Sequence, residues 1–133
     1  MNLFVWTEML ATGNKFMDED HHELVRRVNT VLETIALQQG EQGLSAAMDE
    51  LAAYSREHFA REEVEMKRID FKNMHAHMTE HATLLKQLQA MRDQLDAGKK
   101  FDQMDLYHFL AWWVKDHIRD FDVELAEALA SRS

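Results

Sequence analysis

The stretch NMHAHMTEHATLLKQLQAMRDQLDA, residues 73–97, carries an apolar stripe and a pair of histidines in one helical register. His77 and His81 are four residues apart and lie on one face of a helix, whereas His75 lies about 200° away from His77. The stripe that continues the face of His77 and His81 consists of Leu84, Leu85, Leu88, Met91 and Leu95. The stretch therefore predicts an amphipathic helix whose apolar face ends in two histidines.

Three further helices are expected in the rest of the chain. The sequence has no proline, and its four glycines stand at 13, 40, 43 and 98, which favours long helices. Apolar stripes predict helices over 21–39, 44–69 and 102–130, with Asp18 and Asp102 as N-caps, Gly40 and Gly43 ending the first helix and Gly98 ending the third. We therefore predict an all-α fold, an up-down-up-down four-helix bundle. It forms one domain over residues 1–133, with an irregular N-terminal arm (1–18) and four helices (19–130).

Composition narrows the class of protein. The chain has 133 residues, of which 46% are hydrophobic and 29% are charged, as in a globular protein. Its formal net charge of −9 argues against binding to nucleic acid, and the absence of cysteine excludes disulfides and thiolate metal sites. The N-terminal segment has Glu8 but no basic n-region, so we expect no signal peptide, and no apolar run is long enough for a membrane span. We expect a cytoplasmic monomer.

Polar side chains interrupt each of the four apolar stripes. A histidine within an apolar face needs a partner, and a buried unpaired carboxylate costs several kcal/mol. The interrupting residues are His21, His58, Glu62, His77, His81, His117 and Asp122. Five imidazoles and two carboxylates exceed the four ligands of a closed zinc site, whereas two metal ions that share bridging carboxylates use all seven. Nitrogen and oxygen donors without sulfur favour iron over zinc or manganese, so the pattern predicts a dinuclear iron site.

These motifs resemble those of the hemerythrin family, in particular the small bacterial hemerythrins. The segment WTEMLATGNKFMDEDH (6–21) is similar to the family's tryptophan-to-glycine lead-in before its first histidine ligand. HFARE (58–62) matches the family's HxxxE element, HMTEH (77–81) its HxxxH element and HIRDFD (117–122) its HxxxxD element. The four elements occur in the family's order, and the resemblance covers nearly the whole chain.

The resemblance implies reversible dioxygen binding at a non-heme diiron centre, in an oxygen carrier, store or delivery protein. It implies that the protein is not an enzyme, although weak oxidase or peroxidase side activity is compatible with such a site. The expected partner is dioxygen, and an expected recipient of the oxygen is a membrane oxidase. The resemblance also implies an oxo or hydroxo group that bridges the two irons. The implied ligands are His77, His81 and His117 for one iron, His21 and His58 for the other, and Glu62 and Asp122 as bridges.

A dry oxygen pocket beside the ligands is also implied. Its expected residues, which lie near the ligands by helical offset, are Leu24, Phe59, Trp113, Val114 and Ile118. Each of them is also an ordinary core residue, so the oxygen-pocket role rests on the resemblance.

Two positions depart from the family's pattern. The family commonly has glutamine before its first histidine and lysine after it, where this chain has Asp20 and His22. Helical position favours His21 over His22 as the ligand. Asp20 has two interpretations. It is either a hydrogen-bond acceptor that tunes the iron bound by His21, or a solvated residue at the start of the helix. We expect His75 and His108 at the surface.

Parts of the same pattern also fit other functions. The same diiron site is compatible with oxygen, redox or nitric oxide sensing, or with scavenging. HMTEH also fits the HxxEH motif of zinc hydrolases with Glu80 as the base, but this leaves the other five polar residues unexplained. A ferritin-like diiron oxidase needs two Glu-x-x-His motifs, and the needed pairs are absent. A bundle without metal leaves the buried polar residues without partners.

Overall fold

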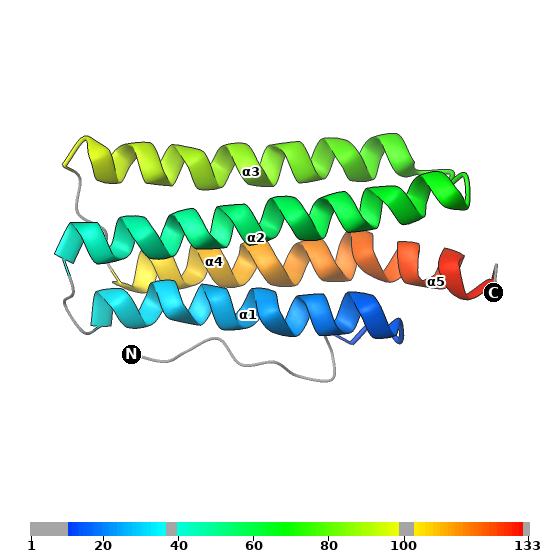
Figure 1. The fold of residues 1–133 in the computed structure, drawn as a ribbon, viewed down its shortest axis with the longest axis horizontal. Coiled ribbons are helices and arrows are strands. Elements are labelled where there is room, and N and C mark those ends of the chain that lie inside the picture. Colours follow the sequence, from blue (N-terminus) through cyan, green and yellow to red (C-terminus); the bar gives the residue numbers. More distant parts are fainter. Residues whose placement is uncertain (1–10, 37–39, 99–102, 132–133) are drawn as a thin grey trace.

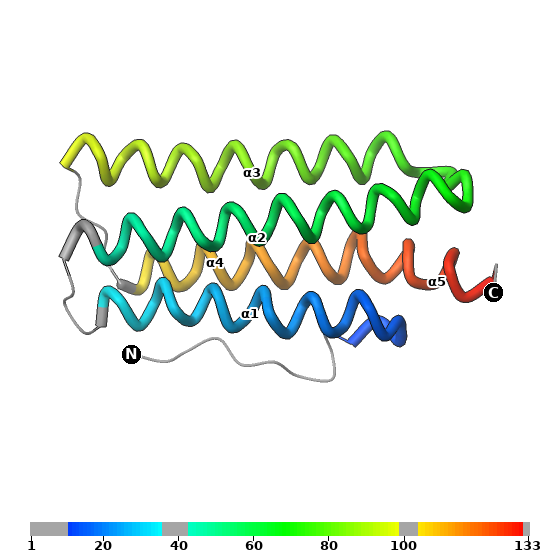
Figure 2. The backbone as a smooth tube through the Cα atoms, in the orientation of Figure 1, coloured from blue at the N-terminus to red at the C-terminus, as the bar shows by residue number. Residues whose placement is uncertain are grey.

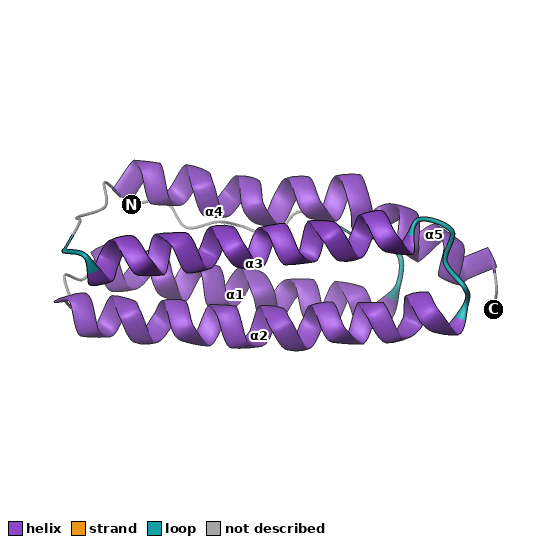
Figure 3. Cartoon of the chain, turned by 90° about the horizontal axis from the view of Figure 1, so that it is seen from above, coloured by secondary structure: helices purple, strands orange, loops and turns teal. Residues whose placement is uncertain are grey.

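The structure, a computed structural model, describes residues 11–36, 40–98 and 103–131 (Figure 1). Its helices are α1 (Lys15–Ala36), α2 (Gly40–Arg68), α3 (Met74–Asp96), α4 (Gln103–His117) and α5 (Val123–Ser131), and the π-helical segment η2 (Ile118–Asp122) joins α4 to α5. α1 packs against α2 and α4, and α2 packs against α3. The chain passes from α4 into α5 as one long helical column (Figure 2), and all the columns follow one axis (Figure 3). The predicted all-α, up-down-up-down four-helix bundle is confirmed.

Two apolar clusters fill the interior of the bundle, one on each side of a layer of buried polar residues. The larger cluster includes Leu24 and Leu51, and the smaller one includes Met17 and Leu125. On α1, His21 lies between Met17 and Leu24, and the polar residues of the other helices take the same position between the clusters. The apolar stripes therefore position a polar layer inside an otherwise apolar core.

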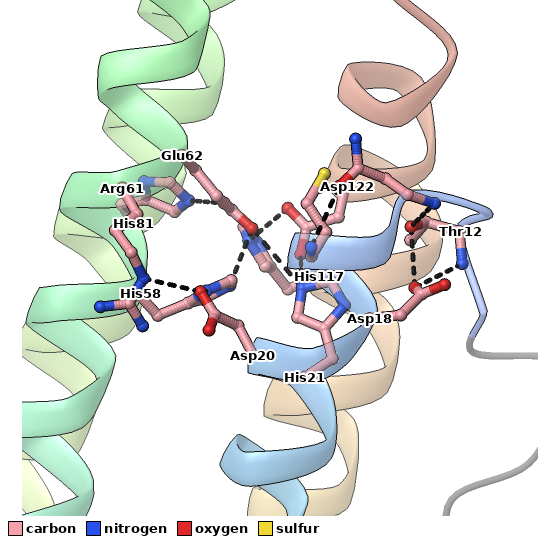
Figure 4. Close-up of polar contacts among 12 residues, drawn as sticks. Thr12, Asp18, Asp20, His21, His58, Arg61, Glu62, His81, His117 and Asp122 are labelled. Atoms are coloured by element: carbon pink, nitrogen blue, oxygen red, sulfur yellow. Dashed lines mark hydrogen bonds and ion pairs between the residues drawn. The ribbon is translucent and has the colours of Figure 1, made fainter. Parts of the chain in front are cut away.

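The first helix begins earlier than predicted, and a different residue caps it. α1 begins at Lys15, and the Oδ1 atom of Asn14 accepts a hydrogen bond of 3.1 Å from the backbone N–H of Met17, which makes Asn14 the N-cap. Asp18 lies inside the helix, so its prediction as the N-cap is wrong. Its carboxylate accepts hydrogen bonds from the N–H and hydroxyl of Thr12, both 2.8 Å, and from the N–H of Gly13 at 3.2 Å. Asp18 thus ties the preceding segment to α1 (Figure 4).

Other helix ends agree with the predictions only in part. α2 begins at Gly40, so Gly40 and Gly43 open the second helix instead of separating it from the first. Each glycine costs about 1 kcal/mol relative to alanine in a helix, and the packing of the long helix that follows offsets this cost. Gly98, with a φ of +83°, follows the end of α3 as predicted, whereas Asp102 lies outside the described residues. Within the described ranges, no helix combines the length and apolarity needed to cross a bilayer.

Replacing the cap of α1 should destabilise the fold measurably. We expect Asn14→Ala to lower the free energy of unfolding by about 1 kcal/mol, because it removes the hydrogen bond to the N–H of Met17. Asn73, at the N-cap of α3, makes no such hydrogen bond and contacts Glu124 at the surface, so Asn73→Ala should cost less. Urea denaturation of both variants measures the difference, and equal losses would contradict the capping role of Asn14.

Candidate metal centre

All seven predicted ligands lie in the polar layer, and each residue is at most 5% exposed. Four helical columns supply them, and Figure 4 shows most of them projecting toward one centre. Pairs that are four residues apart share the inner face of α2 and of α3. The contributions are His21 from α1, His58 and Glu62 from α2, His77 and His81 from α3, His117 from α4 and Asp122 from η2.

The π-helical segment turns His117 and Asp122 toward the same centre. Residues five apart on a regular α-helix point about 140° away from each other. In η2 the hydrogen bonds widen to an i→i+5 pattern, in which the N–H of Val123 donates to the carbonyl of Ile118. The Oδ1 atom of Asp122 consequently lies 3.1 Å from Nε2 of His117. The predicted unbroken helix over 102–130 is wrong at this segment, and the five-residue HxxxxD spacing was the signal for it.

Glu62 presents one carboxylate oxygen to each of two groups of histidines. Its Oε1 atom lies 3.0 Å from Nε2 of His81 and 3.4 Å from Nε2 of His77. Its Oε2 atom lies 2.7 Å from Nε2 of His58 and 3.5 Å from Nε2 of His21. The carboxylate therefore stands between His77 and His81 of α3 on one side and His58 and His21 on the other.

Asp122 divides its two oxygens in the same way. Its Oδ1 atom lies 3.0 Å from Nε2 of His77 and 3.1 Å from Nε2 of His117, and its Oδ2 atom lies 2.8 Å from Nε2 of His21. The structure thus brings the seven residues together as two overlapping groups, each with its ligand atoms within 4.8 Å of one another. One group has three histidines (His77, His81 and His117) and the other has two (His21 and His58), and both share Glu62 and Asp122.

The distances within each group fit ligands around a cation. Two ligands about 2.1 Å from a metal ion and at right angles to each other are about 3.0 Å apart. The nitrogen-to-oxygen distances around Glu62 run from 2.7 to 3.5 Å and bracket this value. Two cations, one in each group and both bound by the shared carboxylates, therefore fit the donor set.

Buried atoms without hydrogen bonds also indicate a cation. Within the described part of the chain, Nε2 of His21, His77 and His117 and both carboxylate oxygens of Asp122 make none. These atoms lie close to one another but lack the angles of a hydrogen bond, because their lone pairs point toward a shared centre. Buried polar atoms without partners are costly, and a bound cation satisfies all of them together.

In the metal-free protein the same cluster holds protons strongly. Burial lowers the pKa of His21, but its contacts with Asp122 and Glu62 outweigh burial and raise the pKa to about 10. The same balance raises the pKa of His77 to about 9. Burial raises the pKa of Glu62 and of Asp122, yet the surrounding histidines hold the pKa of both carboxyls well below its ordinary value. A metal ion therefore has to displace protons from the histidines.

Two further carboxylates hold the outer ring nitrogens of ligand histidines. Nδ1 of His58 lies 3.0 Å from Oδ2 of Asp20, and Nδ1 of His81 lies 2.8 Å from Oε2 of Glu63. Burial raises the pKa of Asp20, but hydrogen bonds from His58 and Arg61 lower it to about 2, so Asp20 is an ionised acceptor and Nδ1 of His58 donates. The structure thus supports the acceptor interpretation of Asp20, although the histidine it orients is His58 and not its neighbour His21. The role of Glu63 was missed in the sequence, where only its position next to Glu62 hinted at it.

The predicted pocket residues are all buried in the larger apolar cluster. Phe59 stacks on the ring of His81 with centroids 4.0 Å apart and an interplanar angle of 7°. Trp113 donates a hydrogen bond of 3.1 Å from Nε1 to the carbonyl of Leu84, which links α4 to α3. The five residues are Leu24, Phe59, Trp113, Val114 and Ile118, and their role toward dioxygen stays a prediction.

The remaining histidines, and the residue that would be the base of the hydrolase motif, lie away from the centre. His75 and His108 are exposed, as predicted, and His22 is exposed as well. Glu80, the base that the zinc-hydrolase alternative requires, belongs to neither ligand group and lines a surface hollow with Trp112. The geometry therefore gives no support to a hydrolase at residues 77–81.

The metal-free protein should lose stability as the pH rises. The folded-state pKa values of His21 and His77, about 10 and about 9, exceed the unfolded value of about 6.5. Their protonation therefore stabilises the fold fully below about pH 6.5, and this contribution disappears as the pH rises toward 10. Urea midpoints of chelator-treated protein should fall across this range. Metal-loaded protein should show a smaller fall, because its ligand histidines are already unprotonated, and equal falls would contradict the assignment.

Comparison with known proteins agrees with this geometry. The model of the hemerythrin HHE cation binding domain matches residues 12–129. A bacteriohemerythrin of Pseudomonas paraeruginosa is 28% identical over 127 residues, 94% of this chain and 80% of that protein. A bacteriohemerythrin of Aquifex aeolicus is 29% identical over 119 residues, 88% of this chain and 90% of that protein. A crystal structure of wild-type hemerythrin matches with a TM-score of 0.85 and 26% identity, covering 97% of this chain and 99% of that one. The chain belongs to the hemerythrin family.

Proposed function

We propose that this chain binds dioxygen reversibly at two iron ions held by the seven buried side chains. The observation that carries the proposal is the placement of the carboxylate oxygens of Glu62 and Asp122. Each carboxylate presents one oxygen to the three-histidine group and the other to the two-histidine group. Shared carboxylates of this kind are what two adjacent cations require. Nitrogen and oxygen donors without sulfur suit iron, and membership of the hemerythrin family supports the same metal.

The two iron positions differ in the number of side chains that serve them. The three-histidine group would hold one iron, the two-histidine group would hold the other, and an oxo or hydroxo group would complete the bridge together with Glu62 and Asp122. The iron of the two-histidine group receives one protein ligand fewer, so this side has room for an added ligand. When bound, the iron pair supplies and takes back the two electrons that reversible dioxygen binding needs.

The charge of the ligand set supports binding over oxidation chemistry. Five unprotonated imidazoles carry no charge, so the chain brings only two negative charges, those of Glu62 and Asp122, to the two cations. A ligand set rich in carboxylates would cancel more of the iron charge and stabilise the oxidised state. The histidine-rich set therefore favours the reduced state in which dioxygen binds.

Burial supports a small ligand and a binding protein instead of an enzyme. Each of the seven side chains is at most 5% exposed, so only a molecule as small as dioxygen fits beside them without rearrangement of the bundle. Apolar side chains next to the ligands, such as Phe59, which stacks on His81, would keep away water and anions that promote oxidation of the irons. Sensing or scavenging would use the same ligands, and we favour a carrier or store.

Metal analysis together with a visible spectrum tests the proposal. We expect two irons per chain, a colourless reduced form, and a coloured form in air that reverses when oxygen is removed. Asp122→Asn removes one of the two shared charges and should lower the iron content below two. Zinc alone, no metal, or immediate oxidation of the irons without a reversible coloured form would each contradict reversible dioxygen binding by a diiron site.

Val114 provides a test of the dry pocket. It is 1% exposed on α4, three residues before His117, and Val114→Thr should speed autoxidation while the iron content stays at two. Val31→Thr is the matched control, since Val31 is also fully buried but lies ten residues from His21, about 15 Å along α1. Both variants should lose stability, by roughly 1–3 kcal/mol. An autoxidation rate equal to that of the Val31 variant would contradict the assignment of Val114 to the pocket.

A further inference from the structure

Three side chains of α2 converge on Asp20 of α1. The Oδ2 atom of Asp20 lies 3.0 Å from Nδ1 of His58 and accepts a hydrogen bond of 2.8 Å from Nε of Arg61. The hydroxyl of Tyr54 donates to Oδ1 at 3.2 Å, and Arg61 also reaches this hydroxyl at 3.5 Å. Positions 54, 58 and 61 are four and three residues apart, so one face of α2 presents all three to Asp20. Figure 4 shows Asp20 beside His58 and Arg61.

The corresponding contact on the other side of the centre is simpler. Nδ1 of His81 lies 2.8 Å from Oε2 of Glu63. In the described part of the chain, Nδ1 of His21, His77 and His117 has no hydrogen-bond partner. One histidine of each ligand group thus has an outer carboxylate, and the carboxylate that serves the two-histidine group also has a cation, Arg61, attached to it.

We infer that Asp20 and Arg61 are positioning residues that act as a pair, in which Asp20 strengthens His58 as a metal ligand and Arg61 moderates that effect. The inference rests on the proposed diiron site. It assigns to Asp20, at the position where the family commonly has glutamine, a role at the iron of the two-histidine group.

The effect of Asp20 follows from the two nitrogens of one imidazole ring. A carboxylate that accepts the Nδ1 proton fixes the tautomer of His58, so its Nε2 lone pair faces the centre, where it lies 2.7 Å from Oε2 of Glu62. The negative charge also makes the ring a stronger electron donor. Stronger donation stabilises the oxidised iron and tightens metal binding.

Arg61 should have the opposite effect on His58, because its positive charge partly neutralises the same carboxylate oxygen. Its side chain is 42% exposed, whereas that of Asp20 is 17% exposed, so solvent weakens the ion pair without removing it. Replacing Arg61 frees the charge of Asp20 for His58. Substitutions at the two residues should therefore change metal binding and reduction potential in opposite directions.

The first experiment tests the contact without iron or dioxygen. In the zinc-loaded, diamagnetic protein, nitrogen-15 NMR should show His58 protonated at Nδ1, with a proton that exchanges slowly with solvent. Asp20→Asn should speed this exchange, and Glu19→Gln, which removes the same charge one residue away, should leave it unchanged. Equal exchange in both variants would overturn the inference.

The second experiment is a double-mutant cycle on the iron-loaded protein. Asp20→Asn should weaken iron retention against a chelator by about 10–100-fold and raise the reduction potential. Arg61→Gln should lower the potential and tighten retention by at most about fivefold. In the Asp20→Asn background Arg61→Gln should have little effect, since its target is gone. The same shift in both backgrounds would show that Arg61 acts by direct charge alone and would overturn the pair.

These outcomes separate the inference from the proposed function. An unaltered chain that binds no iron contradicts the proposed function, whereas the zinc experiment still tests the contact between Asp20 and His58. An unaltered chain with two irons, together with an Asp20→Asn variant that matches Glu19→Gln, contradicts the inference alone. Arg61 is at the surface, so Arg61→Gln should fold and gives the sign of the effect even if Asp20→Asn folds poorly.

Discussion

The structure depends on one electrostatic constraint, the burial of two carboxylates among five imidazoles. Glu62 and Asp122 are fully buried, and an isolated charge in such a place costs several kcal/mol or more. In the metal-free protein, protons on the histidines offset this cost by neutralising the carboxylates, in agreement with the raised pKa values of His21 and His77. Metal ions would offset it in the same way when they replace those protons. Fold stability and metal binding therefore share one set of groups.

The position of the polar layer between two apolar clusters explains how the bundle tolerates it. The larger cluster packs the helices on one side of the layer, and the smaller cluster of Met17, Met66 and Leu125 closes the other side. Each of the seven polar residues therefore lies between apolar residues along the bundle. All seven residues are at most 5% exposed, so the same arrangement shields them from solvent.

The two ligand groups differ in their number of histidines and in the charged residues that surround them. Three histidines serve one side and two serve the other, while outer carboxylates hold His81 through Glu63 and His58 through Asp20. On the two-histidine side, Arg61 adds a positive charge that is paired with Asp20. Under the proposed function, this asymmetry would suit a ligand that binds at one metal position while the charge of both metal ions changes.

The sequence by itself determined the four helices, the bundle and the seven polar residues, because helical periodicity places a histidine such as His77 on a face that leucines continue. It did not determine the cap at Asn14, since Asp18 has equal capping propensity and only the fold of the preceding segment separates them. The five-residue spacing of His117 and Asp122 signalled an irregular helix, but its π-helical form was seen only in the structure, as was the contact between Asp20 and His58. Periodicity predicts which face of a helix a residue occupies. The cap depends instead on the backbone geometry at the start of α1, and the π-turn depends on backbone hydrogen bonds within one helical column. The contact between Asp20 and His58 depends on how two helices pack.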